Sequence, residues 1–286
     1  MSHDTTATTS APAHGAADVY ALGADSDETA RLQRQSDELQ PEARALLARL
    51  GELGVRPGQA AIDLGCGPRG TLDLLADAVA PGGRVVGLDA DAAHVAAARH
   101  YAISHGLADV EVLAGDARRT GLPEGTFDLV HTRALLVTIP EPAEVVAEMT
   151  RLARPGGLVA SQEPDAEFSI CYPPLPEWDR LWSLFHASFA RAGADLRLGR
   201  QLPELFRGAG LVDVGVMVYA SSYPAGHSRR TVIPDLVRSL HPVILGLGLA
   251  DKRELAQVDA AVRAHLADPR TLMMPHLLVT AWGRKP

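Results

Sequence analysis

The stretch that most constrains the fold runs from residue 60 to residue 79 and reads AAIDLGCGPRGTLDLLADAV. Its first five residues are apolar except for Asp63, which predicts a short buried strand, and residues 71–79 have the spacing of an amphipathic helix. Between them, Gly65 and Gly67 permit backbone conformations and close contacts that a Cβ atom would prevent. A strand, a glycine loop and a helix in this order offer a nucleotide-like ligand a surface of bare backbone.

Two interpretations of this loop compete. Gly65, Gly67 and Gly70 have the spacing G-x-G-x-x-G that is typical of dinucleotide-binding folds. The second pattern is Asp-x-Gly-x-Gly, in which Asp63 precedes the first glycine by two positions. A carboxylate beside the glycines suits a positively charged sulfonium ligand and would repel a pyrophosphate. Asp63 therefore favours a sulfonium cofactor over a dinucleotide.

Apolar runs and helical patterns alternate along the rest of the chain. The runs predict strands at residues 84–89, 110–113, 127–131, 158–161, 212–219 and 275–282. Helical spacing is found at residues 91–105, 142–152, 178–192, 202–209 and over most of 232–266, and Asp91 can cap the first of these helices. This alternation predicts an α/β protein with a doubly wound, mostly parallel sheet and helices on both faces. Ligands of such sheets bind beyond the carboxyl ends of the strands.

The polar residues at these predicted strand ends resemble those of a known family. The segment from Asp63 to Gly67 resembles the first motif of the class I methyltransferases, which use S-adenosylmethionine. Asp89 ends the second strand and matches the family's acid for the ribose diol, and Asp116 matches the acid that faces the adenine amino group. The resemblance covers residues 56–165 and implies that family's seven-stranded fold.

Two later segments add to this resemblance, and one residue departs from it. The segment Phe127-Asp128-Leu129-Val130 resembles the family's fourth motif, and residues 152–157 resemble its approach to the fifth strand. Arg69 stands where many members carry a small residue.

The resemblance implies S-adenosyl-L-methionine as cofactor and S-adenosyl-L-homocysteine as product. The predicted cofactor-binding residues are Tyr20, Asp63, Gly65, Cys66, Gly67, Asp89, Ala90, Gly115, Asp116, Ala117, Thr132 and Arg133. For two of them an alternative stays open. Asp63 could orient the loop without touching the ligand, and Arg133 could form a structural ion pair. Cys66 is interpreted as a small residue that fills the loop rather than as a nucleophile.

Acceptor binding is predicted at the exit of the fifth strand, in the segment Gln162-Glu163-Pro164-Asp165. Glu163 is the predicted catalytic residue, which either takes a proton from the acceptor or orients it. An aromatic helix face at residues 178–189 either lines the pocket or belongs to the core. The predicted substrate-binding residues are Gln162, Asp165, Trp182, Phe185 and His186. The histidines lack metal-ligand spacing, so no metal site is predicted.

Three regions follow from the patterning. Residues 1–18 lack periodicity, which predicts a disordered tail. Residues 19–55 are expected to form a helical cap. Residues 56–286 are expected to form a methyltransferase domain with helical insertions near 166–200 and 222–270. The pattern around Tyr20, Arg31 and Gln35 resembles bacterial methyltransferases of specialised metabolism, whose N-terminal segment closes over the cofactor. We therefore expect residues from about 20 to 35 to form a lid.

Composition restricts the partners. A formal charge of -8 without any basic run argues against nucleic acid, and no apolar run approaches the 18 residues of a membrane span. We expect a cytoplasmic enzyme that methylates a small organic acceptor in natural product biosynthesis. It is expected to act without a membrane partner. A homodimer or a higher homo-oligomer is compatible with the sequence. The alternatives are an NAD(P)-dependent oxidoreductase and a protein that binds S-adenosylmethionine without transferring its methyl group. A quinone or lipid acceptor is a further option.

Overall fold

The computed structural model describes residues 26–191 and 195–286. The predicted tail at residues 1–18 and the predicted cofactor contact of Tyr20 lie outside the described residues.

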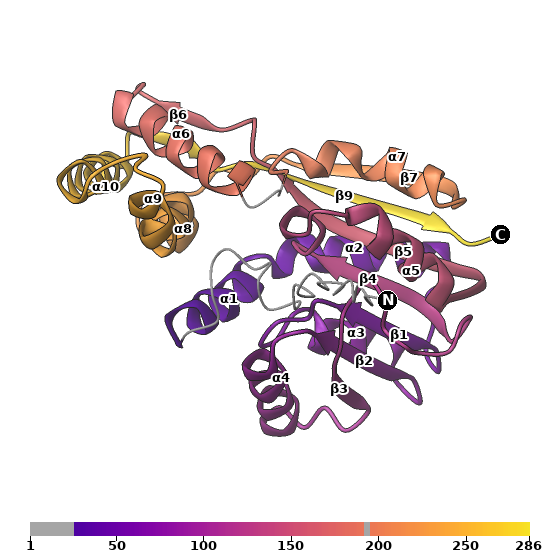
Figure 1. Ribbon diagram of the computed structural model, residues 1–286. Helices are drawn as coiled ribbons and strands as arrows, with labels where there is room; N and C mark the ends of the chain where they lie inside the picture. Colours follow the sequence, from indigo (N-terminus) through magenta and orange to yellow (C-terminus); the bar gives the residue numbers. More distant parts are fainter. Residues whose placement is uncertain (1–25, 192–194) are drawn as a thin grey trace, which may run out of the picture.

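A seven-stranded sheet in the order β3-β2-β1-β4-β5-β9-β7 forms the centre of the molecule (Figure 1). Its strands are β1 (Ala60–Leu64), β2 (Arg84–Asp89), β3 (Val110–Ala114), β4 (Phe127–Arg133), β5 (Ala153–Asp165), β7 (Val212–Tyr219) and β9 (Leu277–Arg284). All neighbours pair in parallel except β9, which is antiparallel to both β5 and β7. The prediction of a doubly wound, mostly parallel seven-stranded sheet is confirmed.

Helices cover both faces of the sheet, because alternate residues of its strands point to opposite sides. In β1, Ala61 packs into the core formed with α2 (Gln40–Leu53), α3 (Leu72–Val79) and α4 (Ala92–Ser104). Its neighbours Ile62 and Leu64 face the other core, which includes α5 (Pro142–Leu152) and α7 (Leu202–Gly208). Two buried cores therefore enclose the strand that leads into the glycine loop.

A group of helices lies beyond the carboxyl ends of the parallel strands (Figure 1). It contains α6 (Pro176–Arg191), η4 (Ser228–Thr231), α8 (Val232–Ser239), α9 (His241–Gly246) and α10 (Lys252–Ala267). A second sheet of two short strands, β6 (Ile170–Tyr172) and β8 (Leu272–Met274), lies beside them. These strands were not predicted, since three residues are too few for a periodic pattern.

The helix α1 (Ser26–Glu38) precedes this frame and lies along the edge where the parallel strands end (Figure 1). Among the described residues, the elements not yet named are two short 3-10 helices, η2 (Leu136–Thr138) and η3 (Leu198–Gln201).

The fifth strand corrects a sequence-based expectation. It was predicted at residues 158–161 after a turn at Pro155–Gly157, but β5 extends from Ala153 to Asp165. Its second half pairs with β9, where Gln162 lies opposite Thr280, and Glu163 opposite Val279. The predicted acceptor-binding segment is therefore part of a buried inner strand and not a strand exit.

Candidate functional site

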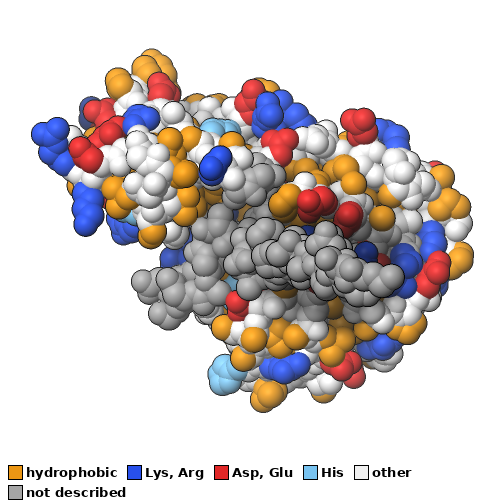
Figure 2. Space-filling view, viewed as in Figure 1, with side chains coloured by type: hydrophobic (Ala, Val, Ile, Leu, Met, Phe, Trp, Pro, Cys, Tyr) orange, Lys and Arg blue, Asp and Glu red, His pale blue; other side chains and the backbone are white. Residues whose placement is uncertain are grey.

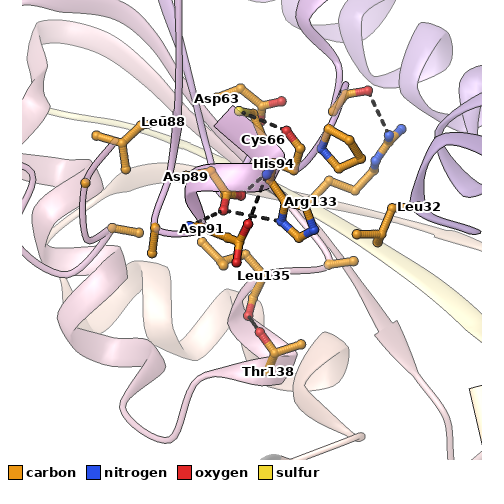
Figure 3. Close-up of a pocket in the computed structure, with 18 of the residues that line it drawn as sticks. Leu32, Asp63, Cys66, Leu88, Asp89, Asp91, His94, Arg133, Leu135 and Thr138 are labelled. Carbon is orange, nitrogen blue, oxygen red and sulfur yellow. Dashed lines mark hydrogen bonds and ion pairs between the residues drawn. The ribbon is translucent and has the colours of Figure 1, made fainter. Parts of the chain in front are cut away.

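A cavity of about 490 Å³ lies at the carboxyl ends of β1 to β4 (Figure 3). The glycine loop and the ends of β2 and β3 form one side, and the segment that follows β4 forms another. From α1, Leu32, Gln35 and Ser36 also line the cavity. The cavity is thus built where an open α/β sheet is expected to bind its ligand.

Asp89 reaches this cavity with both carboxylate oxygens fixed by backbone donors. Its Oδ2 accepts a hydrogen bond of 2.8 Å from the N–H of Gly67, and its Oδ1 accepts one of 2.9 Å from the N–H of Asp91. His94 lies close by, with Nδ1 3.5 Å from Asp89 Oδ1 (Figure 3). A carboxylate oxygen carries two lone pairs, so each oxygen can still accept from a ligand hydroxyl.

The start of α4 holds the neighbouring backbone in place. As predicted, Asp91 caps this helix, and its Oδ1 accepts from the N–H groups of Ala93 at 2.8 Å and His94 at 3.0 Å. This cap fixes the turn that directs Asp89 into the cavity.

Asp63 lies beneath the glycine loop and is almost completely buried. Its Oδ2 accepts hydrogen bonds from the N–H and the hydroxyl of Thr71 at 2.9 and 2.8 Å, and its Oδ1 lies 2.8 Å from His131 Nδ1. Burial by itself raises the pKa of Asp63, but the His131 contact and the Thr71 donors outweigh it, so the pKa lies below its ordinary value. This geometry supports the loop-orienting role that was left open for Asp63.

At Gly65 and Gly70 of the loop, neighbouring atoms leave no room for a Cβ atom. At Gly70, where φ is +56°, a Cβ atom would lie 2.5 Å from Asp63 Oδ2 and 2.6 Å from the Cys66 carbonyl oxygen. At Gly65, where φ is +67°, it would lie 2.6 Å from Leu135 Cδ1. The loop can therefore pack against both the buried carboxylate and the segment after β4 only with glycine at these positions.

Asp116 borders the cavity just after the end of β3, and Arg118 donates hydrogen bonds to its carboxylate. Arg118 Nη2 donates to Asp116 Oδ2 at 2.8 Å, and the Arg118 N–H donates to Oδ1 at 2.9 Å. These hydrogen bonds keep the pKa of Asp116 below its ordinary value. The Asp116 side chain retains 35% exposure, so an ionised acceptor stays accessible from the cavity.

Arg133 lines the cavity from the end of β4 and is only partly satisfied (Figure 3). Its Nη2 donates to Ser36 Oγ at 3.2 Å and to the Gly70 carbonyl at 3.1 Å. Its buried Nη1 has no hydrogen-bond partner within residues 26–191 and 195–286. Because an unpaired buried donor is unfavourable, this guanidinium suits an anionic group of a ligand.

The structure brings together most of the predicted cofactor-binding residues. Those that line the cavity are Asp63, Gly65, Cys66, Gly67, Asp89, Ala90, Gly115, Asp116, Ala117 and Arg133. Thr132 does not line it; its hydroxyl donates to the Leu64 carbonyl at 2.8 Å between β4 and β1. Burial raises the pKa of the Cys66 thiol well above its ordinary value, which agrees with a filler rather than a nucleophile.

Glu163 lies outside the cavity lining and is fully buried. Its Oε1 accepts from the N–H groups of Leu135 at 3.2 Å and Leu136 at 3.1 Å, and its Oε2 accepts from that of Val137 at 3.1 Å. Burial raises its pKa to about 7 despite these donors. Glu163 therefore holds the segment after β4, and that segment forms the cavity wall.

The predicted substrate-binding residues also lie outside the cavity lining. Gln162 Nε2 donates to the Glu42 carbonyl and to Thr280 Oγ1, and Asp165 pairs with Arg200 at 2.5 Å. On α6, Trp182 and Phe185 are buried in the core with their ring centroids 5.6 Å apart, and His186 is stacked at a tilt on Trp182.

Sequence patterns alone did not indicate some residues of the cavity wall. These are Ser36 of α1, just beyond the predicted lid, and the apolar or small residues after β4, namely Ala134, Leu135, Thr138 and Ile139. Ala134 has a positive φ of 52°, a backbone conformation that an alanine in the sequence does not indicate.

Comparison with known proteins agrees with this geometry. Residues 56–196 match the family model described as a methyltransferase domain. An uncharacterised 37.1 kDa protein in transposon TN4556 of Streptomyces fradiae is 39% identical over 163 residues, which cover 56% of this chain and 46% of that protein. The nocamycin O-methyltransferase of Saccharothrix syringae is 36% identical over 138 residues, 48% of this chain and 46% of that one. This chain thus spans about half the length of these two relatives.

Two further comparisons cover more of the known protein. A demethylmenaquinone methyltransferase of Geobacillus is 28% identical over 187 residues, which are 61% of this chain and 80% of that enzyme. A crystal structure of a methyltransferase-like protein from Bacillus halodurans superposes with a TM-score of 0.57 at 17% identity, over 84% of this chain and 98% of that one. At 17% identity, the similarity to the Bacillus halodurans protein shows the fold alone. Residues 56–196 of this chain therefore match a methyltransferase domain, and the sheet around them has the fold of the class I methyltransferases.

Proposed function

We propose that this chain binds S-adenosylmethionine in the 490 Å³ cavity and transfers its methyl group to a small organic acceptor. The observation that carries the proposal is the pair of opposite charges that line the cavity. Asp89 is held with oxygens free to accept from a diol, and Arg133 has a buried donor without a partner in the described chain. An amino-acid nucleoside carries adenine at one end, a ribose diol in the middle and a carboxylate at the other end.

The residues can be assigned to the parts of this ligand. Asp89 would accept from the ribose hydroxyls, Asp116 from the adenine amino group, and Arg133 would donate to the methionine carboxylate. The loop backbone from Gly65 to Gly67 would lie against the nucleoside. Bound S-adenosylmethionine supplies an already activated methyl group, so the protein needs chiefly to orient the reactants and to exclude water.

Named relatives suggest the kind of acceptor. The nocamycin O-methyltransferase and the demethylmenaquinone methyltransferase carry small organic acceptors in their names. Their similarity to this chain supports a small-molecule acceptor and a role in specialised metabolism. The helices α6, α8, α9 and α10 stand at the side of the sheet where such an acceptor would enter.

The proposed enzyme acts without nucleic acid or a membrane as partner. On the face drawn in Figure 2, basic and acidic side chains are interspersed, which agrees with an acceptor other than nucleic acid. No helix in the described ranges is both long and apolar enough to cross a membrane. A cytoplasmic location and a homo-oligomeric state stay predictions, as do the region boundaries at residues 18 and 55.

Calorimetry tests the proposal against its two alternatives. Titration with S-adenosylhomocysteine, NAD⁺ and NADP⁺ should give binding with S-adenosylhomocysteine alone. Incubation with S-adenosylmethionine and a panel of small phenols, carboxylic acids and amines should then give a product heavier by one CH₂ unit. Binding of NAD(P) instead would support an oxidoreductase. Tight S-adenosylhomocysteine binding without transfer to any acceptor would support a binding protein.

A further inference from the structure

Two adjacent arginines of η4 are equally buried, and only one of them is satisfied. Arg229 and Arg230 each have 3% exposure. Arg230 donates to four backbone carbonyl oxygens, those of Leu266, Tyr223, Thr271 and Asp268, at distances between 2.7 and 3.3 Å. Its contacts explain its burial as a structural crosslink between η4 and the end of α10.

Arg229 has no such set of acceptors. Its Nη2 reaches His276 Nε2 at 3.4 Å, and its Nη1 lies 3.9 Å from Glu38 Oε2, beyond hydrogen-bond distance. Its Nε is buried and makes no hydrogen bond to any residue that the structure describes. The guanidinium carbon lies 5.7 Å from the centroid of the Tyr223 ring, and the ion pair with Glu38 at 3.9 Å is too long for a hydrogen bond. A buried guanidinium with such distant partners has its charge balanced only in part, which is costly.

His276 does not neutralise the positive charge of Arg229. Its Nδ1 lies 3.0 Å from the Leu277 carbonyl oxygen and therefore carries the proton, which leaves Nε2 to accept from Arg229. Burial and then the charge of Arg229 lower the pKa of His276 to about 4, so the imidazole is neutral at physiological pH. The ring orients the guanidinium but adds no negative charge.

Arg229 lies near the cofactor cavity without lining it. Glu38, its ion-pair partner, and Ser228, its chain neighbour, border a small hollow of about 30 Å³ between α1 and the start of α8. Gln35 lines both this hollow and the 490 Å³ cavity. The hollow has room only for water, so a larger molecule can enter only when α1 moves away from η4.

From this contrast we infer that Arg229 is the binding residue for an anionic group of the methyl acceptor, a carboxylate or an ionised phenol or enol oxygen. The inference rests on the proposed function and specifies its acceptor. The anion would take the position beside Nε and Nη1 that Glu38 approaches only to 3.9 Å. A guanidinium offers two parallel N–H groups, which can bind the two oxygens of a carboxylate or converge on one phenol or enol oxygen.

The cavity wall after β4 agrees with an acidic acceptor. Ala134, Leu135, Thr138 and Ile139 line it, and none of these side chains can take a proton at neutral pH. His94 lines another side of the cavity, where its Nδ1 lies 3.5 Å from Asp89. An acceptor oxygen that is already ionised needs no such base. Its negative charge would also be stabilised by Arg229.

A pair of probes that differ only in charge tests the inference. The protein, saturated with S-adenosylhomocysteine, is titrated with 2-naphthoate and with 2-naphthamide, and binding is followed by ligand-observed NMR. We expect the acid to bind at least about tenfold more tightly than the amide. The variant Arg229→Gln should remove this preference, Arg229→Lys should keep part of it, and S-adenosylhomocysteine affinity should stay within about twofold.

Arg238→Gln is the matched control, because Arg238 is a half-exposed arginine of α8 that pairs with Asp259 at 3.0 Å. It should bind both probes like the wild type. Equal binding of acid and amide to the wild type overturns the inference even if Arg229→Gln fails to fold. So does a preference that survives in folded Arg229→Gln, or a tenfold loss of S-adenosylhomocysteine affinity in that variant. If the wild type does not bind S-adenosylhomocysteine at all, the proposed function fails instead.

Discussion

The carboxylate of Asp89 accepts a 2.8 Å hydrogen bond from the backbone N–H of Gly67, 22 residues earlier in the chain. This contact joins the end of β2 to the glycine loop that follows β1. The residue proposed to hold the ribose thus also fixes the backbone against which the nucleoside would lie. Loop shape and ligand recognition are coupled through one side chain.

Asp89→Ala should weaken S-adenosylhomocysteine binding by at least about tenfold. Two hydrogen bonds to a charged acceptor contribute about 1.5 to 3 kcal/mol each, and the variant loses both. Isothermal titration calorimetry measures the change. Asp109→Ala, at an exposed position before β3, is the control and should bind like the wild type. A folded Asp89→Ala protein of unchanged affinity would remove Asp89 from the site.

Asp63→Asn should lower the free energy of unfolding by about 1–3 kcal/mol, because an amide nitrogen would face the donors of Thr71. Urea denaturation measures this, with Asp77→Asn on the exposed side of α3 as the control. The Asp63 pKa is lowered on folding, so its stabilisation is present above the unfolded value of about 3.8 and is lost as the pH falls. The difference between wild type and Asp63→Asn should therefore shrink below about pH 4; a constant difference would contradict it.

The sequence predicted the parts of the fold that depend on local pattern. The apolar strands, the cap at Asp91 and the acids near the carboxyl ends of β1, β2 and β3 each depend on residues close together in the chain. Helix α5 and strand β7 begin and end at the residues that the sequence predicted. Ligand positions at strand ends then followed from the parallel topology.

What the sequence could not predict depends on contacts between distant segments. Pro155, Gly156 and Gly157 resemble a turn, yet β9, more than a hundred residues later, pairs with the long β5 that includes them. The same pairing buries Glu163, which looked like a group at an open strand end. The incomplete hydrogen bonding of Arg133 and Arg229 is likewise visible only in three dimensions.

Glu163→Gln should lower both turnover and S-adenosylhomocysteine affinity. One amide oxygen cannot replace two carboxylate oxygens that accept from three backbone N–H groups, so the cavity wall after β4 would shift. Calorimetry and a turnover assay measure the two effects. A loss of turnover on the order of 10²-fold with unchanged cofactor affinity would instead support the originally predicted base.

Wild-type stability should also depend on Glu163 through pH. Its pKa rises from 4.5 to about 7 on folding, so its contribution is fully present below about pH 4.5 and is lost as the pH rises through 7. The Glu163→Gln variant cannot titrate there. The difference in unfolding free energy between the two proteins should therefore change between pH 5 and 8; parallel pH profiles would show that Glu163 keeps an ordinary pKa in the folded state.

Truncation tests the lid predicted for residues from about 20 to 35. The described part of α1 gives this prediction a physical basis. Leu32, Gln35 and Ser36 line the cavity, Ser36 accepts from Arg133, and Asp37 pairs with Arg69 of the glycine loop. Deletion of the first 40 residues would remove all of these contacts, whereas deletion of the first 17 leaves them in place.

The shorter deletion should therefore keep S-adenosylhomocysteine affinity and turnover, and the longer one should abolish retention of the cofactor through gel filtration. Because α2 begins at Gln40 and its buried Leu46 and Leu50 pack on the sheet, the protein that lacks the first 40 residues must be shown to melt cooperatively. The double variant Asp37→Ala/Ser36→Ala in the full chain is the milder test. It should raise the dissociation rate of the cofactor, since α1 would lose its polar contacts to Arg69 and Arg133. If both truncations retain the cofactor equally, α1 is not a lid.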